Sequence, residues 1–212
     1  MKITKFGHCC LLIEEQDARI LTEPGSWNDV PEVTDLDEIL ISHEHADHIH
    51  IKSVQKLVEI NKNVVIYTHA GVKKLLDADA VPCVLVADGE EVVVKGVSVM
   101  SSGSEHACIH HEMPLVQNTG FYIAGKFFYP GDSFHNPHKV IEVLALPVSG
   151  PWMKIEEAIE YAKVIKPKVV FPVHDAMLRE DRREFTRRLP KMLLDKSGIE
   201  FVDMIEGSVV DF

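Results

Sequence analysis

Three histidines and one aspartate lie close together in the segment His43-Glu44-His45-Ala46-Asp47-His48. Imidazole nitrogens and carboxylate oxygens are common ligands for transition-metal ions. In extended backbone, residues two apart project to the same side, so His43 and His45 can bind one ion. Asp47 and His48 point away from that pair, toward a second ion. The segment therefore predicts a site for two metal ions.

The segments on either side of this motif indicate how it is held. Residues 38–42 are apolar and predict a buried strand that ends just before His43. After Ala46, apolar residues recur every three or four positions and predict a helix, with Asp47 and His48 in its first turn. A carboxylate is favourable there because it faces the positive end of the helix dipole.

Composition limits the domain count and the partners. The chain has 212 residues, 46% of them hydrophobic, which is enough for one substantial core. We expect a single domain over residues 1–212. The formal net charge is −11 and no long run of Lys and Arg is present, so nucleic acid is not expected as a partner. The expected partner is a small-molecule substrate, and the sequence leaves open whether the chain forms a homo-oligomer.

The cysteines and the amino terminus indicate the compartment. Cys9, Cys10, Cys83 and Cys108 form no CxxC pair and no disulfide framework, so we expect reduced thiols. The first residues pass directly into a strand pattern without the features of a signal peptide, and no apolar run reaches membrane-spanning length. These features predict a cytoplasmic protein that does not associate with a membrane.

The remaining apolar patterns predict short strands alternating with helices. A meander of three strands opens the chain at 2–6, 9–14 and 18–22. Further strands are predicted at 63–67, 83–87, 91–94, 97–101, 119–123, 126–129, 141–146, 168–173, 200–205 and 208–212. Helices are predicted at 69–78 with Thr68 as its cap, at 155–165 and at 179–196, and Asp88-Gly89 is predicted as a hairpin turn. This order favours an α/β fold in which two packed sheets carry helices on their outer faces.

Further ligands are needed, because four side chains cannot fill the coordination shells of two ions. Loops just past strand ends are the expected sources, since a rigid scaffold can direct several such side chains to one point. Three residues meet this condition. His106 follows the strand at 97–101, Asp132 follows the apolar pair Phe127-Phe128, and His174 directly follows the strand at 168–173.

Together these residues resemble the motifs of the metallo-β-lactamase superfamily of hydrolases. His43, His45, Asp47 and His48 match its HxHxDH motif, and the later motif residues follow in order as His106, Asp132 in a Gly-Asp-Ser turn, and His174. The resemblance spans nearly the whole chain. It implies a four-layer αββα sandwich with the metal ions in a cleft at one edge of the two sheets.

The resemblance also implies how the ligands are shared. The first ion would be bound by His43, His45 and His106. The second would be bound by Asp47, His48 and His174, and the carboxylate of Asp132 would bridge the two ions.

Departures from larger relatives narrow the expected activity. Antibiotic-degrading members are typically exported, and many carry cysteine where this chain has Asp132, so that activity is not expected. The chain also lacks the helical carboxyl-terminal domain of the glyoxalase II group and the basic arm of the tRNA 3′-processing nucleases. Its compactness, with Phe6-Gly7-His8 and Leu146-Pro147-Val148, resembles the small cytoplasmic branch that includes L-ascorbate-6-phosphate lactonase-like proteins.

The expected chemistry follows from two neighbouring ions. Two ions about 3.5–4 Å apart can share a bridging hydroxide near neutral pH, because zinc lowers the pKa of bound water to about 7. We expect this hydroxide to attack a small-molecule ester, lactone or phosphoester, which makes the chain a metal-dependent hydrolase. Asp47 is expected to orient the hydroxide and relay a proton to the leaving group. The ligands suit zinc, manganese and iron alike, and we expect two divalent ions with zinc as the first choice.

An alternative function uses the same site without hydrolysis. A redox or sensing protein could hold iron in the same dinuclear cage. Redox members usually carry an additional flavin or rubredoxin-type domain, for which this chain has no room. Hydrolysis is therefore the preferred function.

Four other residues are candidates for contact with substrate. They are His8, Trp27, Ser133 and His135. The alternatives are structural, since a histidine in a hairpin is commonly a hydrogen-bonded group and a loop tryptophan commonly packs against its neighbours. His110 and His111 follow His106 closely, but they are expected on a loop rim because the ligand shells are already full.

Overall fold

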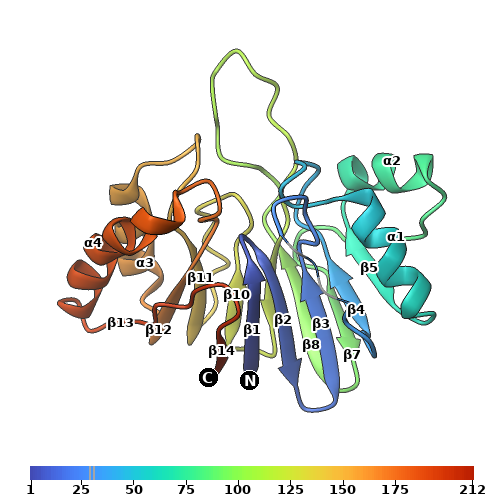
Figure 1. The fold of residues 1–212 in the computed structure, drawn as a ribbon, viewed down its shortest axis with the longest axis horizontal. Coiled ribbons are helices and arrows are strands. Elements are labelled where there is room, and N and C mark those ends of the chain that lie inside the picture. Colours follow the sequence, from blue (N-terminus) through green and yellow to red (C-terminus); the bar gives the residue numbers. More distant parts are fainter. Residues whose placement is uncertain (29, 31) are drawn as a thin grey trace.

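Two β-sheets pack face to face, and helices cover the outer face of each sheet (Figure 1). The computed structural model describes residues 1–212 except Asp29 and Pro31, with backbone only for Glu180 and Phe185. The layers form an αββα sandwich, which confirms the predicted fold class. Among the described residues, no helix combines the length and the apolar character that crossing a bilayer requires.

The first sheet has the strand order β14-β1-β2-β3-β4-β5-β6. The pairs from β14 to β3 are antiparallel, whereas those from β3 to β6 are parallel. Parallel neighbours need crossover connections, which the helices α1 (Ile51–Ile60) and α2 (Ala70–Ala78) provide. The strands are β1 (Lys2–Gly7), β2 (Cys10–Glu15), β3 (Ala18–Thr22), β4 (Glu38–Leu40), β5 (Val65–Thr68), β6 (Val84–Leu85) and β14 (Val209–Asp211).

The second sheet repeats this plan with the order β13-β12-β11-β10-β9-β8-β7. The pairs from β7 to β10 are antiparallel and those from β10 to β13 are parallel. In the parallel half, the helix α3 (Ile155–Ile165) connects β11 to β12, and α4 (Arg183–Asp195) connects β12 to β13. The strands are β7 (Glu91–Val94), β8 (Val97–Ser102), β9 (Gly120–Ile123), β10 (Phe127–Tyr129), β11 (Val143–Pro147), β12 (Val169–Val173) and β13 (Glu200–Phe201).

The alternation of side chains along each strand builds the layers. In β2, Leu11 and Ile13 pack between the sheets, whereas Leu12 packs on the outer side with the residues of α1 and α2. In β10, Phe127 and Tyr129 face the other sheet, and Phe128 packs against α3. The inner faces of the two sheets therefore form one core, and the outer faces of β2 and β10 pack against helices.

Two local predictions around the motif are wrong. Asp47 and His48 lie in a turn closed by hydrogen bonds from the backbone N–H groups of His48 and Ile49 to the carbonyl oxygen of His45. The helix starts only at Ile51, so the helix dipole does not act on Asp47 as expected.

Three other predicted boundaries also need correction. Thr68 does not cap α2, because its hydroxyl donates to the carbonyl oxygen of Ile41, and His69 Nδ1 accepts from the N–H of Gly71 instead. Asp88-Gly89 does not close a hairpin, because β6 belongs to the first sheet and β7 to the second. The helix expected from 179 begins with a short 3-10 turn, Glu180–Arg182, before α4.

Glu38 in β4 is a buried acid whose burial affects stability. Its side chain is 2% exposed, and its Oε2 has no hydrogen-bond partner among the described residues. Burial, with a smaller contribution from Asp37, raises the pKa of Glu38 from 4.5 to about 7. The folded protein therefore keeps a proton that the unfolded chain loses between these pH values, so this group lowers the free energy of unfolding as pH rises through them.

Glu38→Gln should remove that cost. The free energy of unfolding is expected to rise by about 2 kcal/mol at pH 8 and to change little at pH 4. Urea unfolding of both proteins at both pH values, after chelation of metal, measures the difference. An equal change at the two pH values would contradict the titration of Glu38.

Candidate metal centre

Seven potential metal ligands gather at one edge of the sandwich. The first sheet contributes His43, His45, Asp47 and His48, which follow β4. The second sheet contributes one residue after each of three strands, namely His106 after β8, Asp132 after β10 and His174 after β12. The two sheets thus each supply part of one candidate metal centre.

The first cluster consists of His43, His45, His106 and Asp132, whose ligand atoms all lie within 4.8 Å of one another. His43 Nε2 lies 3.0 Å from His45 Nδ1. His106 Nε2 lies 3.4 Å from Asp132 Oδ2, and His43 Nε2 lies 4.0 Å from the same oxygen. Ligands of a tetrahedral zinc ion are roughly 3.3 Å apart, given metal–nitrogen bonds of about 2.0–2.1 Å. The cluster therefore has the size of a zinc site.

The second cluster contains Asp47, His48 and His174, together with His8. Asp47 Oδ2 lies 3.5 Å from His174 Nε2 and 3.7 Å from His48 Nε2. Asp132 reaches this cluster as well, because its Oδ1 lies 3.2 Å from His48 Nε2 and its Oδ2 lies 2.9 Å from His174 Nε2. Asp132 thus lies between the two clusters, where a bridging carboxylate belongs.

Several buried ligand atoms in these clusters have no hydrogen-bond partner among the described residues. They are Nε2 of His48, His106 and His174 and Oδ1 of Asp132. A buried polar atom without a partner costs about 1–3 kcal/mol, so four such atoms at one place call for a ligand that satisfies them together. A metal ion bound by nitrogen and oxygen meets this requirement.

Hydrogen bonds orient three of the ligand histidines. His106 Nδ1 donates to the carbonyl oxygen of Ala107, His48 Nδ1 donates to Glu23 Oε2 at 2.6 Å, and His43 Nδ1 bonds to Ser42 Oγ at 2.9 Å. With the proton on Nδ1, each ring directs the lone pair of Nε2 into its cluster. Partners of this kind fix the tautomer of metal-binding histidines.

Charges in the centre favour a cation. Burial alone would raise the pKa of Asp132, but the histidines beside it, His48 first, hold it well below its usual value. Asp132 and Glu23 in turn raise the pKa of His48 well above its ordinary value, so a metal ion that binds His48 Nε2 displaces a proton from it. Burial lowers the pKa of His43 well below its ordinary range, so this imidazole is neutral at pH 7. The centre therefore combines an anionic carboxylate with a neutral imidazole, which are the protonation states that metal binding needs.

Glu23 is a functional residue that the sequence analysis missed. Its carboxylate is fully buried and accepts hydrogen bonds from the backbone N–H of Ser42 at 2.7 Å, from Ser42 Oγ at 3.0 Å and from His48 Nδ1. Since Ser42 Oγ also contacts His43, one carboxylate orients histidines of both clusters. An acid directly after the strand β3 was the available signal, because the other ligands also follow strand ends.

Glu23→Gln should weaken metal binding by about 10–100-fold, the usual cost of losing a group that orients metal ligands. The carboxylate accepts hydrogen bonds at both of its oxygens. In glutamine one of these oxygens becomes an NH₂ group, which would then face an N–H or O–H donor without being able to accept from it. Competition with a chromophoric zinc chelator measures the affinity. Glu38→Gln, at the other buried glutamate of the same sheet, is the matched control and should leave the affinity unchanged. Equal affinities for both variants would contradict this role of Glu23.

Backbone packing also fixes the motif. Gly25 lies so close to it that a Cβ atom there would be 1.8 Å from the carbonyl oxygen of Asp47. Ser26 donates to the carbonyl oxygen of Ala46 from both its N–H and its hydroxyl. Asp132 is held similarly, by Trp152 Nε1 donating to its Oδ2 at 2.7 Å and by its own N–H donating to Asn118 Oδ1. Neither Asn118 nor Trp152 could be identified from spacing.

His8 is buried, and both of its ring nitrogens are engaged. Its Nδ1 accepts from the backbone N–H of Ala176 at 3.2 Å, so the neutral ring carries its proton on Nε2. Burial lowers the pKa of His8 to about 4, which keeps the ring neutral at pH 7. Nε2 then donates to Asp47 Oδ2 at 3.2 Å. This tautomer fits a residue that positions Asp47, because neither ring nitrogen is left free to bind a metal ion. Substrate contact by His8 stays a prediction.

His8→Leu and His8→Gln distinguish these roles. Leucine removes the hydrogen bond to Asp47, so we expect the more weakly held of two zinc ions to dissociate about 10–100-fold more readily. Glutamine retains an N–H donor and should restore most of the affinity. Zinc titration with a competing chelator measures both variants. If glutamine were as damaging as leucine, His8 would be a ligand and not a positioning residue.

The other candidate contacts lie around the centre. Trp27 is 48% exposed, and its ring centroid lies 5.0 Å from that of His8, beside the second cluster. Ser133 and His135 line a pocket on one flank of His106, and His135 Nε2 bonds to Ser102 Oγ. Substrate contact by these three residues stays a prediction. His110 and His111 are exposed and lie outside both clusters.

Comparisons with known proteins place this geometry in a family. A protein of Mycobacterium tuberculosis is 34% identical over 219 residues, which cover 100% of both chains. A Nanoarchaeum equitans protein named UPF0173 metal-dependent hydrolase is 24% identical, again over 100% of both chains. The solved structure of a metallo hydrolase from Ignicoccus hospitalis superposes with a TM-score of 0.75 at 22% identity, covering 99% of this chain and 97% of that one. The family model described as beta-lactamase superfamily domain matches residues 2–174, and this chain therefore belongs to the beta-lactamase superfamily.

Proposed function

We propose that this protein is a metal-dependent hydrolase that binds two divalent ions and cleaves a small-molecule ester, lactone or phosphoester. The observation that carries the proposal is the meeting of two ligand clusters at the buried carboxylate of Asp132. The nitrogen and oxygen ligands suit zinc, our first choice, as well as manganese and iron. The printed name of the Nanoarchaeum relative supports the same class of activity.

The bound ions would supply an activated water near neutral pH and polarise the carbonyl or phosphoryl group under attack. The protein's residues set the geometry. Asp132 fixes the spacing of the two clusters, and Glu23 and His8 orient their ligands. The Asp47 side chain is 14% exposed, and its Oδ1 forms no hydrogen bond within the described residues. This oxygen is available to orient the attacking water and to pass a proton to the leaving group.

Three finer assignments belong to the same proposal. Within the superfamily we place the chain in the small branch that includes L-ascorbate-6-phosphate lactonase-like proteins. We propose one domain over residues 1–212, because α4, β13 and β14 lie beyond the matched residues 2–174 and complete both layers. A cytoplasmic location remains our expectation.

Elemental analysis and a substrate panel test the proposal. Purified protein should contain about two redox-inert divalent ions per chain. Lactones, thioesters, phosphomonoesters and phosphodiesters are then assayed with added Zn²⁺ and Mn²⁺, and at least one class should be hydrolysed, with activity lost on chelation and restored by metal. Iron with a visible absorption band, and no hydrolysis of any class, would instead support the redox or sensing alternative.

A further inference from the structure

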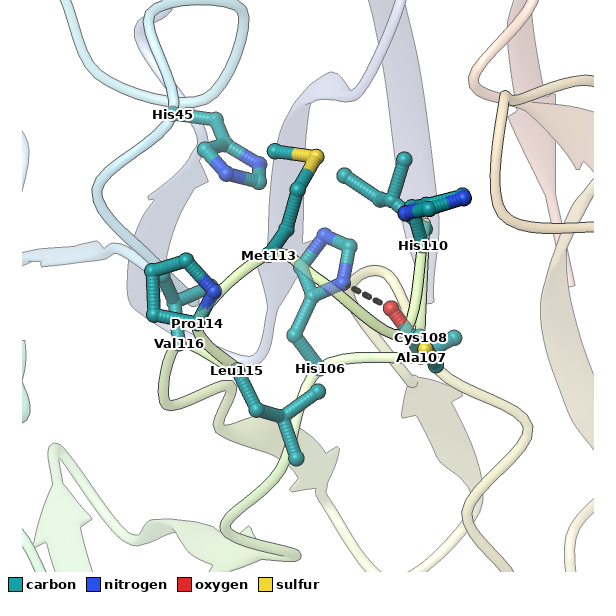
Figure 2. A pocket seen from close by; sticks show the side chains of 10 residues that line it. His45, His106, Ala107, Cys108, His110, Met113, Pro114, Leu115 and Val116 are labelled. Atoms are coloured by element: carbon teal, nitrogen blue, oxygen red, sulfur yellow. Dashed lines mark hydrogen bonds between the residues drawn. The ribbon is translucent and has the colours of Figure 1, made fainter.

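A pocket with an apolar wall adjoins the first ligand cluster. Its volume is about 110 Å³, and it is bounded by His45, His106 and apolar side chains that include Ile109, Met113, Leu115 and Val116 (Figure 2). Apart from His45, its lining residues all come from the β8–β9 connection, residues 103–119. Figure 1 shows this connection, in yellow-green, rising above the edge of the sheets that bears the metal centre.

The wall of this pocket is tied to the metal ligands. The N–H of Ala107 donates to the carbonyl oxygen of Asp132 at 2.8 Å. The N–H of His106 donates to the carbonyl oxygen of Val116 at 3.1 Å, which joins the two arms of the connection at their base. The pocket is therefore held in a defined position relative to the first cluster, as a substrate-binding wall must be.

Two large apolar side chains of the wall are left accessible to solvent. Met113 and Leu115 are each 53% exposed, and Figure 2 shows Met113 extending toward the His45 ring. Exposed apolar groups that gather beside a cleft are typical of ligand-binding surfaces. A ligand on the metal centre with an apolar group would cover them.

A second pocket that also adjoins His106 has different chemistry. Its volume is about 290 Å³, and it is lined by polar side chains, including Asp88, Glu105, Ser133 and His135. Two carboxylates would repel an anionic group of the substrate from this side. His106 thus borders both an apolar pocket and a pocket that carries two carboxylates.

We infer that the substrate is an uncharged carboxylic ester, lactone or thioester whose acyl side carries a short aliphatic group that occupies the apolar pocket. This inference rests on the proposed function. Size limits the group, because a cavity of about 150 Å³ holds one benzene molecule and this pocket is smaller. An aliphatic chain of about four carbons fits that limit.

Binding of n-alkylphosphonates to the zinc-loaded protein tests the inference without turnover. The phosphonate head binds the metal ions, and the alkyl tail probes the pocket. Calorimetric titration should show affinity rising about fourfold per methylene, or about 60-fold from methyl- to butylphosphonate, with no further gain for octylphosphonate. Equal or falling affinity along the series would overturn the inference.

Substitutions locate the effect. Met113→Ser and Leu115→Ser, separately and together, should reduce the methyl-to-butyl ratio of affinities, to less than about threefold in the double variant. Val140→Ser changes an apolar residue that is 81% exposed and outside the pocket, and should preserve the full ratio. Zinc content is measured for each variant, so that loss of metal is not mistaken for loss of the pocket.

The outcomes separate the two proposals. If methylphosphonate binds and the longer alkylphosphonates bind with the same affinity, the hydrolase proposal stands and the proposed role of the pocket is rejected. No phosphonate binding by protein that retains two zinc ions, together with no turnover in the substrate panel, would reject the hydrolase proposal and the pocket with it. Preferred hydrolysis of phosphomonoesters over aliphatic esters would reject the inferred substrate class alone.

Discussion

Asp132→Asn is expected to release both metal ions and to lower kcat/KM by at least about 10³-fold. Metal ions supply several kcal/mol of transition-state stabilisation, and each 1.36 kcal/mol is a factor of ten in rate. Asp132 is 2% exposed and contacts histidines of both clusters, so no water can readily replace its carboxylate. The variant leaves Asp47 as the only carboxylate among the proposed ligands.

Metal content by elemental analysis and initial rates on the best substrate measure this effect. Asparagine can still accept the hydrogen bond from Trp152, so the fold should persist, and circular dichroism checks that it does. Asp37→Asn is the matched control, because Asp37 contacts Arg19 and Lys95 and no proposed ligand. Two bound ions with normal turnover in Asp132→Asn would rule out a bridging role.

Asp47→Asn is expected to lower kcat by about 10²–10⁴-fold while both ions remain bound, which is the usual contribution of a proton-transferring group. An amide oxygen can still serve as a ligand and accept the hydrogen bond from His8. It cannot take up a proton at the exposed oxygen. Burial alone would raise the pKa of Asp47. The hydrogen bond from His8 and the nearby histidines outweigh this effect and lower the pKa to about 2, so the wild-type group is a carboxylate at neutral pH.

Single-turnover rates and zinc content distinguish this result from simple loss of metal. Loss of one ion together with activity would assign Asp47 a purely structural role as ligand. Retention of both ions with full turnover would remove it from the proton-transfer step. Asp132→Asn provides the contrast, because its loss of activity is expected to result from loss of the metal ions.

The sequence predicted the parts of the centre that depend on strand ends. His106, Asp132 and His174 could be proposed because each follows an apolar run, and the structure brings all three to the edge where the motif lies. The apolar runs at 9–14 and 126–129 likewise predicted the strands β2 and β10. These features depend on periodicity within one element, which a sequence displays directly.

Contacts between elements could not be predicted in this way. Glu23 contacts His48 from a loop 25 residues earlier in the chain, and Trp152 reaches Asp132 across 20 residues. No spacing rule links such pairs, because tertiary packing decides which loops meet. The turn at Asp47 and His48 was missed for a related reason, since the apolar period of α1 continues backward past its true start at Ile51.

The origin of the ligands in both sheets has a consequence for assembly. His43 and His45 follow a strand of the first sheet, whereas His106 follows one of the second, so an ion bound to these three residues would cross-link the sandwich at its edge, much as a disulfide would. A cross-link between distant segments favours the folded state, and for a metal ion the gain grows with the concentration of free metal. Removal of the metal should therefore lower the free energy of unfolding by loosening the contact between the two sheets.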